Sequence, residues 1–421
     1  MARTERFRFS HTRQIDSAYH YVSAAVDAGV IMRSAQSESG RFVSLDGDRL
    51  MNFGSCSYMA LEARPELREA AHRAIDDYGT QFHFSRAYVQ CPLYLELEAL
   101  LEQMTGRPVV VAASTSLGHM AALPVLVRDG DFVVIDQFAH ASLHSAVKLI
   151  PGVSLEILRH NRMDQLDALL TRLKDHQGHV WYLADGLYSM LGDCAPWADL
   201  KDLLDRHDKL RLYIDDAHAT SCFGKHGRGL ALEHFGGDER VVVALSLNKA
   251  FSAAGGVIAV SSREMADRIR RCGGPMLFSG PIQPPMLGAA VGSARLHTSS
   301  EFPRLQAELH DRIAQCVALV GQRDLQLAGI QHTPIFQTQC DSPRVVFNVA
   351  KLMQERGFLC CICVFPAVPM NRPGIRFTIS RHNHQGDIIA FVDALEECLA
   401  LGRHQAILQP EAESYATVGA E

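Results

Sequence analysis

The sequence has no long hydrophobic run. Its longest apolar stretch, residues 358–368 (FLCCICVFPAV), is well short of the roughly 18–20 residues that a membrane-spanning helix requires. We interpret this stretch as a buried strand and its exit. The first residues, MARTERFRFSHTRQ, carry charge but are not followed by an apolar segment of the signal-peptide type. The sequence therefore predicts no membrane span and a cytoplasmic location.

The chain also lacks an excess of positive charge. Its 421 residues include 41 lysines and arginines against 47 aspartates and glutamates, which gives a formal net charge of −6. No overall positive field is available to attract nucleic acid or an anionic lipid surface. We therefore expect no nucleic-acid partner, although a local basic site stays open.

Metal-binding signatures are missing as well. The 11 cysteines are odd in number and scattered, and Cys360, Cys361 and Cys363 do not make a paired metal-ligand spacing. The 20 histidines include no HExxH motif. We expect no metal site, and we interpret the cysteines as reduced, mostly buried thiols.

The composition is that of an ordinary globular protein, with 47% hydrophobic and 21% charged residues. Short β-rich runs at 109–113, 132–135, 153–158, 180–184, 210–214, 241–245 and 257–260 alternate with stretches of helical spacing such as 163–174 and 197–207. Apolar strands separated by helices indicate a mostly parallel sheet that is covered on both faces. The sequence thus predicts a large α/β domain.

The pattern changes after about residue 302. A long helical stretch is followed by predicted strands near 344–347, 358–364 and 375–379 and by a helix at 385–401, which is typical of a smaller α+β domain. We expect an N-terminal arm at 1–50 that packs with this small domain, the large domain at 51–290, the small domain at 291–404 and a mobile tail at 405–421.

The most informative single residue is Lys249, in the segment SLNKAF (246–251). It follows the apolar strand VVVAL and precedes Gly255 and Gly256. A lysine at the end of a core strand is rarely buried without a purpose, and its amine can form a Schiff base with a carbonyl compound. For an isolated SLNK segment we would favour a lysine at the strand end that reaches solvent, so the neighbouring motifs must decide.

Polar side chains follow several other predicted strands. They are Asp215, Asp216 and His218 (YIDDAH), Asp185 and Ser189 (DGLYSM), His140 (DQFAHAS), and Ser114, Thr115 and Ser116 after VVVAA. Open α/β sheets bind ligands at the carboxyl ends of their strands. A buried carboxylate there needs a cation such as a protonated pyridine nitrogen, and free N–H groups at a helix start suit a phosphate. We interpret Asp216 as a helix cap, and His140 alone could be a cap or a core residue.

Taken in order, these segments resemble the α-oxoamine synthase family of fold type I pyridoxal-phosphate (PLP) enzymes, over roughly residues 52–401. The landmarks are NFGS (52–55), YG (78–79), SR (85–86), AHAS (139–142), DGLYSM (185–190), DDAH (215–218), SLNKAF (246–251), GG (255–256), FS (278–279) and GIRFT (374–378). The resemblance implies a fold type I PLP-transferase, with a large, mostly parallel sheet of the seven-stranded type and a smaller α+β C-terminal domain. It also implies pyridoxal 5′-phosphate as the cofactor.

The resemblance implies roles for four catalytic residues. Lys249 matches the lysine that holds the cofactor and then moves the proton at the substrate α-carbon. Asp215 matches the carboxylate that pairs with the pyridinium nitrogen. His218 matches the partner of the ring 3′-oxygen, and His140 matches the imidazole stacked on the ring face.

The resemblance further implies the rest of the binding site. The phosphate is expected at Thr115 and Ser116, with Ser246 and, from a neighbouring subunit, Ser279; Ser114, Asp185 and Ser189 complete the expected cofactor-binding set. Arg376 matches the arginine that binds the amino-acid carboxylate through its planar fork. Cys56, Ser85 and Arg86 complete the expected substrate-binding set.

The sequence also departs from the family pattern. Cys56 stands where an asparagine is usual, TQFHF (80–84) replaces a glycine-rich run, and Tyr94 stands where a histidine is usual. We expect these changes to reshape the acyl entrance or the amino-acid pocket.

The activity that the resemblance implies is decarboxylative condensation of an α-amino acid with an acyl thioester, carried by coenzyme A or an acyl carrier protein. The products are an α-aminoketone, carbon dioxide and free thiol, and the family builds its site in a homodimer. An aminotransferase or other PLP chemistry on the same fold is the alternative, and a cofactor-binding regulatory protein without activity is another. Many aminotransferases stack an aromatic side chain on the ring, whereas the matching residue here is His140.

Overall fold

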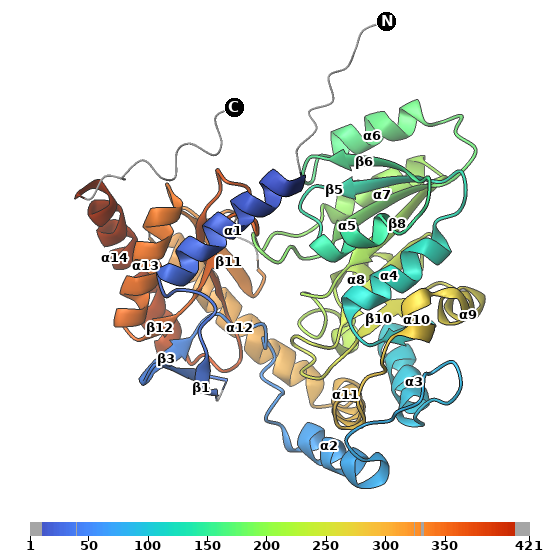
Figure 1. Ribbon diagram of the computed structural model, residues 1–421, viewed down its shortest axis with the longest axis horizontal. Helices are drawn as coiled ribbons and strands as arrows, with labels where there is room; N and C mark the ends of the chain where they lie inside the picture. Colours follow the sequence, from blue (N-terminus) through green and yellow to red (C-terminus); the bar gives the residue numbers. More distant parts are fainter. Residues whose placement is uncertain (1–10, 39, 324, 330–331, 409–421) are drawn as a thin grey trace, which may run out of the picture. The chain divides into compact units, whose positions relative to one another are not determined.

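The computed structural model describes residues 11–38, 40–323, 325–329 and 332–408. The chain forms two compact units, which are coloured along the sequence in Figure 1. The large unit contains Cys56–Asp311 and Ser380–His382, and the small unit contains the described parts of Met1–Ser55, Arg312–Ile379 and Asn383–Glu421. The first ten residues of the expected arm, and the expected tail beyond residue 408, lie outside the described residues.

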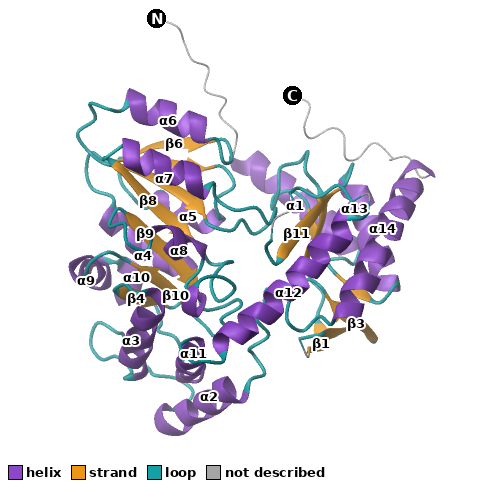
Figure 2. Cartoon of the chain, turned by 180° about the vertical axis from the view of Figure 1, so that it is seen from behind, coloured by secondary structure: helices purple, strands orange, loops and turns teal. Residues whose placement is uncertain are grey.

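A seven-stranded sheet forms the centre of the large unit (Figure 2). Its strands, in spatial order, are β4 (Val109–Ala112), β10 (Gly256–Ala259), β9 (Val241–Ser246), β8 (Leu210–Asp215), β7 (Val180–Asp185), β5 (Phe132–Asp136) and β6 (Ser154–Leu158). All neighbouring pairs are parallel except those of β10, which is antiparallel to both β4 and β9. The predicted mostly parallel sheet is thus confirmed. The direction of β10 differs because only a short loop joins it to β9, and a parallel crossover needs about a dozen residues or more.

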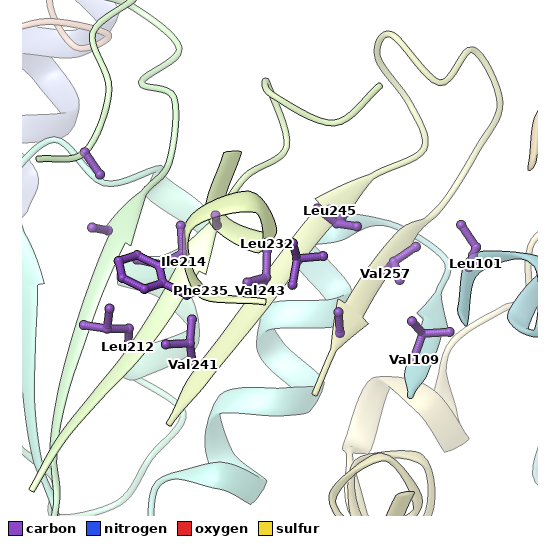
Figure 3. Packing of buried hydrophobic residues seen from close by; sticks show 14 of the residues in the cluster. Leu101, Val109, Leu212, Ile214, Leu232, Phe235, Val241, Val243, Leu245 and Val257 are labelled. Carbon is purple, nitrogen blue, oxygen red and sulfur yellow. The ribbon is translucent and has the colours of Figure 1, made fainter. Parts of the chain in front are cut away.

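Helices cover both faces of this sheet, because side chains alternate between the faces along each strand. On one face pack α3 (Leu93–Thr105), α6 (Met163–Arg172), α7 (Trp197–Arg206), α8 (Leu230–Phe235) and α11 (Pro284–His297). On the other face pack α4 (Thr115–Leu126), α5 (Ala141–Val147), α9 (Arg263–Cys272) and α10 (Gly274–Phe278). Figure 3 shows Phe235 of α8 near Val241 and Leu212. Full burial of each such apolar side chain contributes roughly 1.5–3 kcal/mol to the free energy of unfolding.

The large unit also contains α2 (Pro65–Tyr78), which packs against α11. Gly288 and Gly292 of α11 permit this close approach, since a Cβ at either residue would lie 2.4 or 2.7 Å from a backbone oxygen of α2. Helix α12 (Phe302–Gly321) begins in the large unit and ends in the small unit.

The small unit contains two sheets. One has the order β1 (Ala35–Glu38), β2 (Phe42–Leu45), β3 (Asp48–Asn52) and β12 (Phe358–Leu359), and the other has the order β11 (Ile335–Gln339), β14 (Gly374–Thr378) and β13 (Cys361–Cys363). Its helices include α1 (His11–Asp27), α13 (Pro343–Glu355) and α14 (Gln385–Leu408). No helix within the described residues is both long enough and apolar enough to cross a membrane.

One predicted strand in this unit is wrong. Residues 344–347 lie in α13, whose start is fixed by Ser342: the Ser342 side chain accepts the N–H of Val345, and Pro343 occupies the first turn. The apolar run RVVF therefore forms one face of a helix. Strand β14 pairs with β13 and with β11, and β11 was not predicted from the sequence.

A half-buried histidine, His160, joins the end of a strand to a loop at the edge of the large sheet. His160 bonds through Nδ1 to Asp136 Oδ1 at 3.0 Å and through Nε2 to Asp193 Oδ2 at 2.7 Å. Burial alone would lower the pKa of His160, but the two carboxylates outweigh it and raise this pKa to about 9. The imidazole is therefore positively charged near neutral pH and bridges the end of β5 to the loop after β7.

Replacing His160 with glutamine is expected to lower the free energy of unfolding in a pH-dependent way. The raised pKa means that the native chain holds a proton which the unfolded chain loses near pH 6.5. The stabilisation is therefore complete below about pH 6.5 and is lost as the pH rises through about 9. Urea unfolding between pH 6 and 10 should show the gap between wild type and His160→Gln shrinking. His72→Gln, at an exposed position on α2, is the control, and a gap independent of pH would contradict the account.

Candidate active site

A polar cavity opens at the carboxyl ends of the central strands, with a volume of about 170 Å³. The strand order brings the ends of β7, β8 and β9 together, and β4 runs parallel to β9 because both are antiparallel to β10. The lining residues are Ser114, Thr115, Ser116, His140, Ser142, Asp185, Asp215, Ala217, His218, Ser246, Asn248 and Lys249. The structure thus brings together most of the residues predicted from the sequence.

The N-terminus of helix α4 forms one side of the cavity. The Ser114 side chain caps this helix by accepting the N–H of Leu117, so the backbone N–H groups at the helix start remain for an anion. The helix start lies directly against strand β10, where a Cβ on Gly256 would come within 2.4 Å of Thr115 N and Cα. Only glycine at position 256 permits this approach. The close contact fixes the N-terminus of α4 beside the cavity.

Lys249 lies in the loop between β9 and β10. Asn248 Oδ1 accepts the N–H of Gly255 at 2.7 Å, and Ser246 Oγ accepts the N–H of Asn248 at 3.2 Å, so the loop is fixed on both sides of the lysine. Within the described residues, Lys249 Nζ forms no hydrogen bond of its own. Its amine is thus available to a ligand in the cavity.

Two buried carboxylates face this amine with different charge states. Burial by itself would raise the pKa of Asp215, but His119, which bonds Asp215 Oδ2 at 2.9 Å, together with Lys249 and His140, holds this pKa below its usual range. The pKa of Asp185 is raised, first by burial and then by the charge of Asp215. Asp215 is therefore the ionised member of the pair, and Asp185 Oδ1 accepts the N–H of His140 at 3.0 Å.

The two predicted site histidines are held in fixed orientations. His140 caps α5, and its Nδ1 accepts the N–H of Ser142 at 3.3 Å, which leaves the proton of the neutral ring on Nε2. Burial lowers the pKa of His140, so this neutral form persists near neutral pH. His218 Nδ1 lies 2.8 Å from the hydroxyl of Tyr58.

The sequence predicts Asp216 as the cap of the next helix, but the N-cap residue of α8 is Gly229. Asp216 instead contacts the first turn of α8 from the end of β8. Its Oδ2 accepts the N–H of Ala231 at 2.9 Å, in the first turn of α8. The carboxyl group is fully buried between Gly186 and Gly229, and a Cβ at either glycine would lie 2.1 or 2.2 Å from an Asp216 oxygen. Burial raises the pKa of Asp216 to about 7.

Several predicted residues do not line this cavity. Ser189 and Cys56 belong to the large unit but are absent from the lining, and Ser279 donates its hydroxyl to Pro275 O. Ser85 donates to Leu277 O at 2.8 Å. Arg376 lies on β14 of the small unit. Their roles toward cofactor or substrate stay predictions.

Arg86 already has partners within its own unit. Its guanidinium donates to Val111 O at 2.6 Å, pairs with Glu98 at 3.2 Å and lies over the ring of Tyr94 at 3.7 Å. The Tyr94 hydroxyl in turn accepts the N–H of Ile282. These contacts fix the entry to α3, and a role of Arg86 in substrate binding stays a prediction.

Three residues of the site, His119, Ser142 and Asn248, were not predicted from the sequence. Ser142 lies two residues after His140 in the motif AHAS, and Asn248 directly precedes Lys249 in SLNK, so their positions carried a signal that was not used. His119 lies inside the apolar helix α4, one turn beyond Ser116, and only the fold brings it to Asp215. Among the described residues, no group of three or more His, Cys, Asp or Glu side chains is arranged to hold a metal ion.

Comparisons with known proteins identify related sequences. Residues 48–388 match the family model of aminotransferase class I and II. Curated relatives include 8-amino-7-oxononanoate synthases from Coprothermobacter proteolyticus (29% identical, covering 90% of this chain and 95% of the relative) and Maricaulis maris (30%, 87% and 91%). A serine palmitoyltransferase from Sphingobacterium spiritivorum is 28% identical, covering 82% of this chain and 86% of the relative.

Solved structures share the fold. Serine palmitoyltransferase from S. paucimobilis, solved with a bound PLP-myriocin aldimine, gives a TM-score of 0.85 at 19% identity and covers 94% of this chain and 100% of that chain. The 8-amino-7-oxononanoate synthase from Francisella tularensis gives 0.70 at 19% identity, covering 84% and 99%. The fold type I architecture predicted from the sequence is thus confirmed. The chain belongs to the aminotransferase class I and II family and, within it, to the α-oxoamine synthases.

Proposed function

We propose that this chain is a PLP-dependent acyltransferase that condenses an α-amino acid with an acyl thioester. The products are an α-aminoketone, carbon dioxide and a free thiol. The observation that carries the proposal is a single cavity that combines Lys249, the ionised Asp215 and the N-terminus of α4. The relatives named 8-amino-7-oxononanoate synthase and serine palmitoyltransferase support the same reaction class.

The donor set of the cavity fits PLP group by group. The Lys249 amine, which forms no hydrogen bond with any described residue, suits the aldehyde, and a buried anion suits a protonated ring nitrogen. The N–H groups at the start of α4, with the hydroxyls of Thr115, Ser116 and Ser246, suit the phosphate. His218 would hold the ring 3′-oxygen, and the neutral His140 would cover the ring face.

PLP, when bound, supplies a carbonyl for amines and a ring that accepts the electron pair left at the substrate α-carbon. Lys249 first holds the cofactor, then yields its place to the substrate amine and takes the α-proton on Nζ. Arg376 is proposed to hold the substrate carboxylate by a bidentate contact. The α-carbon then forms a bond to the acyl carbon, the C–S bond breaks and the thiolate leaves. The carboxyl group departs as carbon dioxide, and Lys249 returns a proton to the α-carbon.

The neutral His140 has a further proposed role in this reaction. With its ring proton on Nε2, it can donate a hydrogen bond to the acyl carbonyl oxygen as negative charge develops there. A lowered pKa suits this role, because a neutral imidazole donates without adding a second positive charge beside Lys249.

We further propose that the enzyme is a homodimer and acts in the cytoplasm. Ser85 and Leu277 are hydrogen-bonded, and around them Phe84, Tyr88 and Phe278 are exposed, by 87% for Tyr88 and 88% for Phe278. Large apolar side chains gathered in this way are typical of a protein interface. All eleven cysteines are free thiols, as expected in a reducing compartment.

The reaction class is tested by the release of thiol. Holoenzyme incubated with a panel of amino acids and acyl thioesters, both coenzyme A and carrier-protein forms, should release free thiol only when a suitable amino acid is present. Replacing the thioester with a 2-oxoacid should give no amino transfer. Amino transfer without thiol release would instead favour an aminotransferase.

A further inference from the structure

A chain of three buried side chains lies behind the cavity. His119 Nε2 is 2.9 Å from Asp215 Oδ2, and His119 Nδ1 is 2.9 Å from the hydroxyl of Tyr213. His119 and Tyr213 are 0% exposed, and Asp215 is 5% exposed. The other carboxylate oxygen, Oδ1, accepts the N–H of Ala217 at 3.1 Å. The position of the Asp215 carboxylate is therefore fixed by protein contacts on both of its oxygens.

The fold determines how these residues meet. Tyr213 and Asp215 are two residues apart on β8, so they point to the same face of the sheet, which α4 covers. Helix α4 approaches closely because Gly118 faces Ile258 at a distance that a Cβ would reduce to 3.2 Å. His119, the next residue of the helix, is thereby brought against β8. The same helix presents its N-terminus to the cavity, so one element serves both ends of the site.

Hydrogen-bond directions can be assigned along the chain. Burial, and next the charge of Asp215, raise the pKa of Tyr213 well above its usual value, so the phenol keeps its proton. It can donate to His119 Nδ1, and His119 Nε2–H then donates to Asp215.

The hydrogen bond from His119 to Asp215 matters because the site holds two buried carboxylates. Asp185 and Asp215 repel each other, and the other groups that act on the pair are Lys249, His140 and Asp136. Without His119, burial would favour protonation of Asp215 as well as Asp185. His119 acts on Asp215 and so selects which of the two acids keeps the negative charge.

We propose that His119 is a positioning residue that keeps Asp215 ionised and oriented to pair with a protonated ring nitrogen, while Tyr213 fixes the His119 ring. This inference rests on the proposed function, because it assumes PLP in the cavity. It assigns to the interior of α4 a role in the chemistry of the site, in addition to the anion site at the helix start.

The test compares PLP with a carbocyclic analogue in which C–H replaces the ring nitrogen. Apoenzyme is titrated with each compound, and the dissociation constant is measured by absorbance or fluorescence. In His119→Leu, affinity for PLP should fall at least about tenfold, equivalent to one pKa unit or more at Asp215. Affinity for the analogue should stay within about twofold, since it has no protonated nitrogen for the Asp215 carboxylate to pair with.

Two milder variants keep the test decisive should His119→Leu fail to fold. His119→Gln retains an N–H donor to Asp215 but cannot carry positive charge. Tyr213→Phe removes the hydroxyl that contacts His119 Nδ1. Both should lose PLP affinity by less than the leucine variant, and neither should lose affinity for the analogue. Equal losses for PLP and the analogue, or no loss for either, would overturn the role of His119. Failure of the wild type to bind PLP at all would overturn the proposed function as well.

Discussion

Replacing Lys249 with alanine is expected to reduce turnover by about 10²–10⁴-fold, because the variant loses both the amine that holds the cofactor and the base that takes the α-proton. Binding of PLP should weaken but persist, since Asp215, His218 and the start of α4 still line the cavity. Thiol release under saturating substrates, with PLP occupancy measured separately, distinguishes lost chemistry from lost cofactor.

Two further variants separate the chemistry of Lys249 from its charge. Lys249→Arg keeps a cation beside Asp215, but a guanidinium stays protonated and is a poor nucleophile, so its turnover should be as low as that of the alanine variant. Lys201→Ala, at an exposed position on α7, should retain full activity. A Lys249→Ala enzyme that turned over at the normal rate would rule out the assignment.

Replacing Gly256 with alanine is expected to damage both stability and cofactor binding. The new Cβ would lie 2.4 Å from Thr115 N and Cα and 2.6 Å from the Ser114 carbonyl carbon, and all three are backbone atoms that cannot move singly. Helix α4 must then shift away from β10, at a cost of about 1–3 kcal/mol in the free energy of unfolding. Because the same helix start is the proposed phosphate site, affinity for PLP should also fall at least about tenfold.

Gly237 offers a matched control for this substitution. A Cβ there would meet no atom within 4 Å, so Gly237→Ala should change the free energy of unfolding by no more than about 0.5 kcal/mol. Urea unfolding of both apo variants, with PLP titrations alongside, measures the two effects. Unchanged stability and affinity in Gly256→Ala would show that α4 does not depend on this close contact.

Much of the large unit could be predicted from local patterns. Apolar runs that end abruptly in Asp185, Asp215 and Ser246 mark strand ends, and parallel strands bring their carboxyl ends to one edge. The cavity that contains these residues follows directly from that rule. The strand pattern alone does not predict the direction of β10. That direction follows from the shortness of the loop that joins β9 to β10, which excludes a parallel crossover.

What the sequence could not reveal depends on contacts between distant segments. His119 has no local signal, since it occupies an apolar helix and acquires its role only when α4 packs on β8. The run RVVF was mistaken for a strand because β-branched residues also fill the buried face of a helix, and the Ser342-Pro343 start was the stronger signal.

The central claim is that the Lys249 site couples formation of the bond between the substrate α-carbon and the acyl carbon to loss of the substrate carboxyl group. The most direct measurement supplies holoenzyme with an amino acid labelled with ¹³C in its carboxylate, together with an acyl thioester, and counts labelled carbon dioxide against free thiol. The account predicts one labelled carbon dioxide for each thiol released, and formation of both products reduced by about 10²–10⁴-fold with Lys249→Ala. Thiol release that leaves the label in the amino acid or in the product would contradict it.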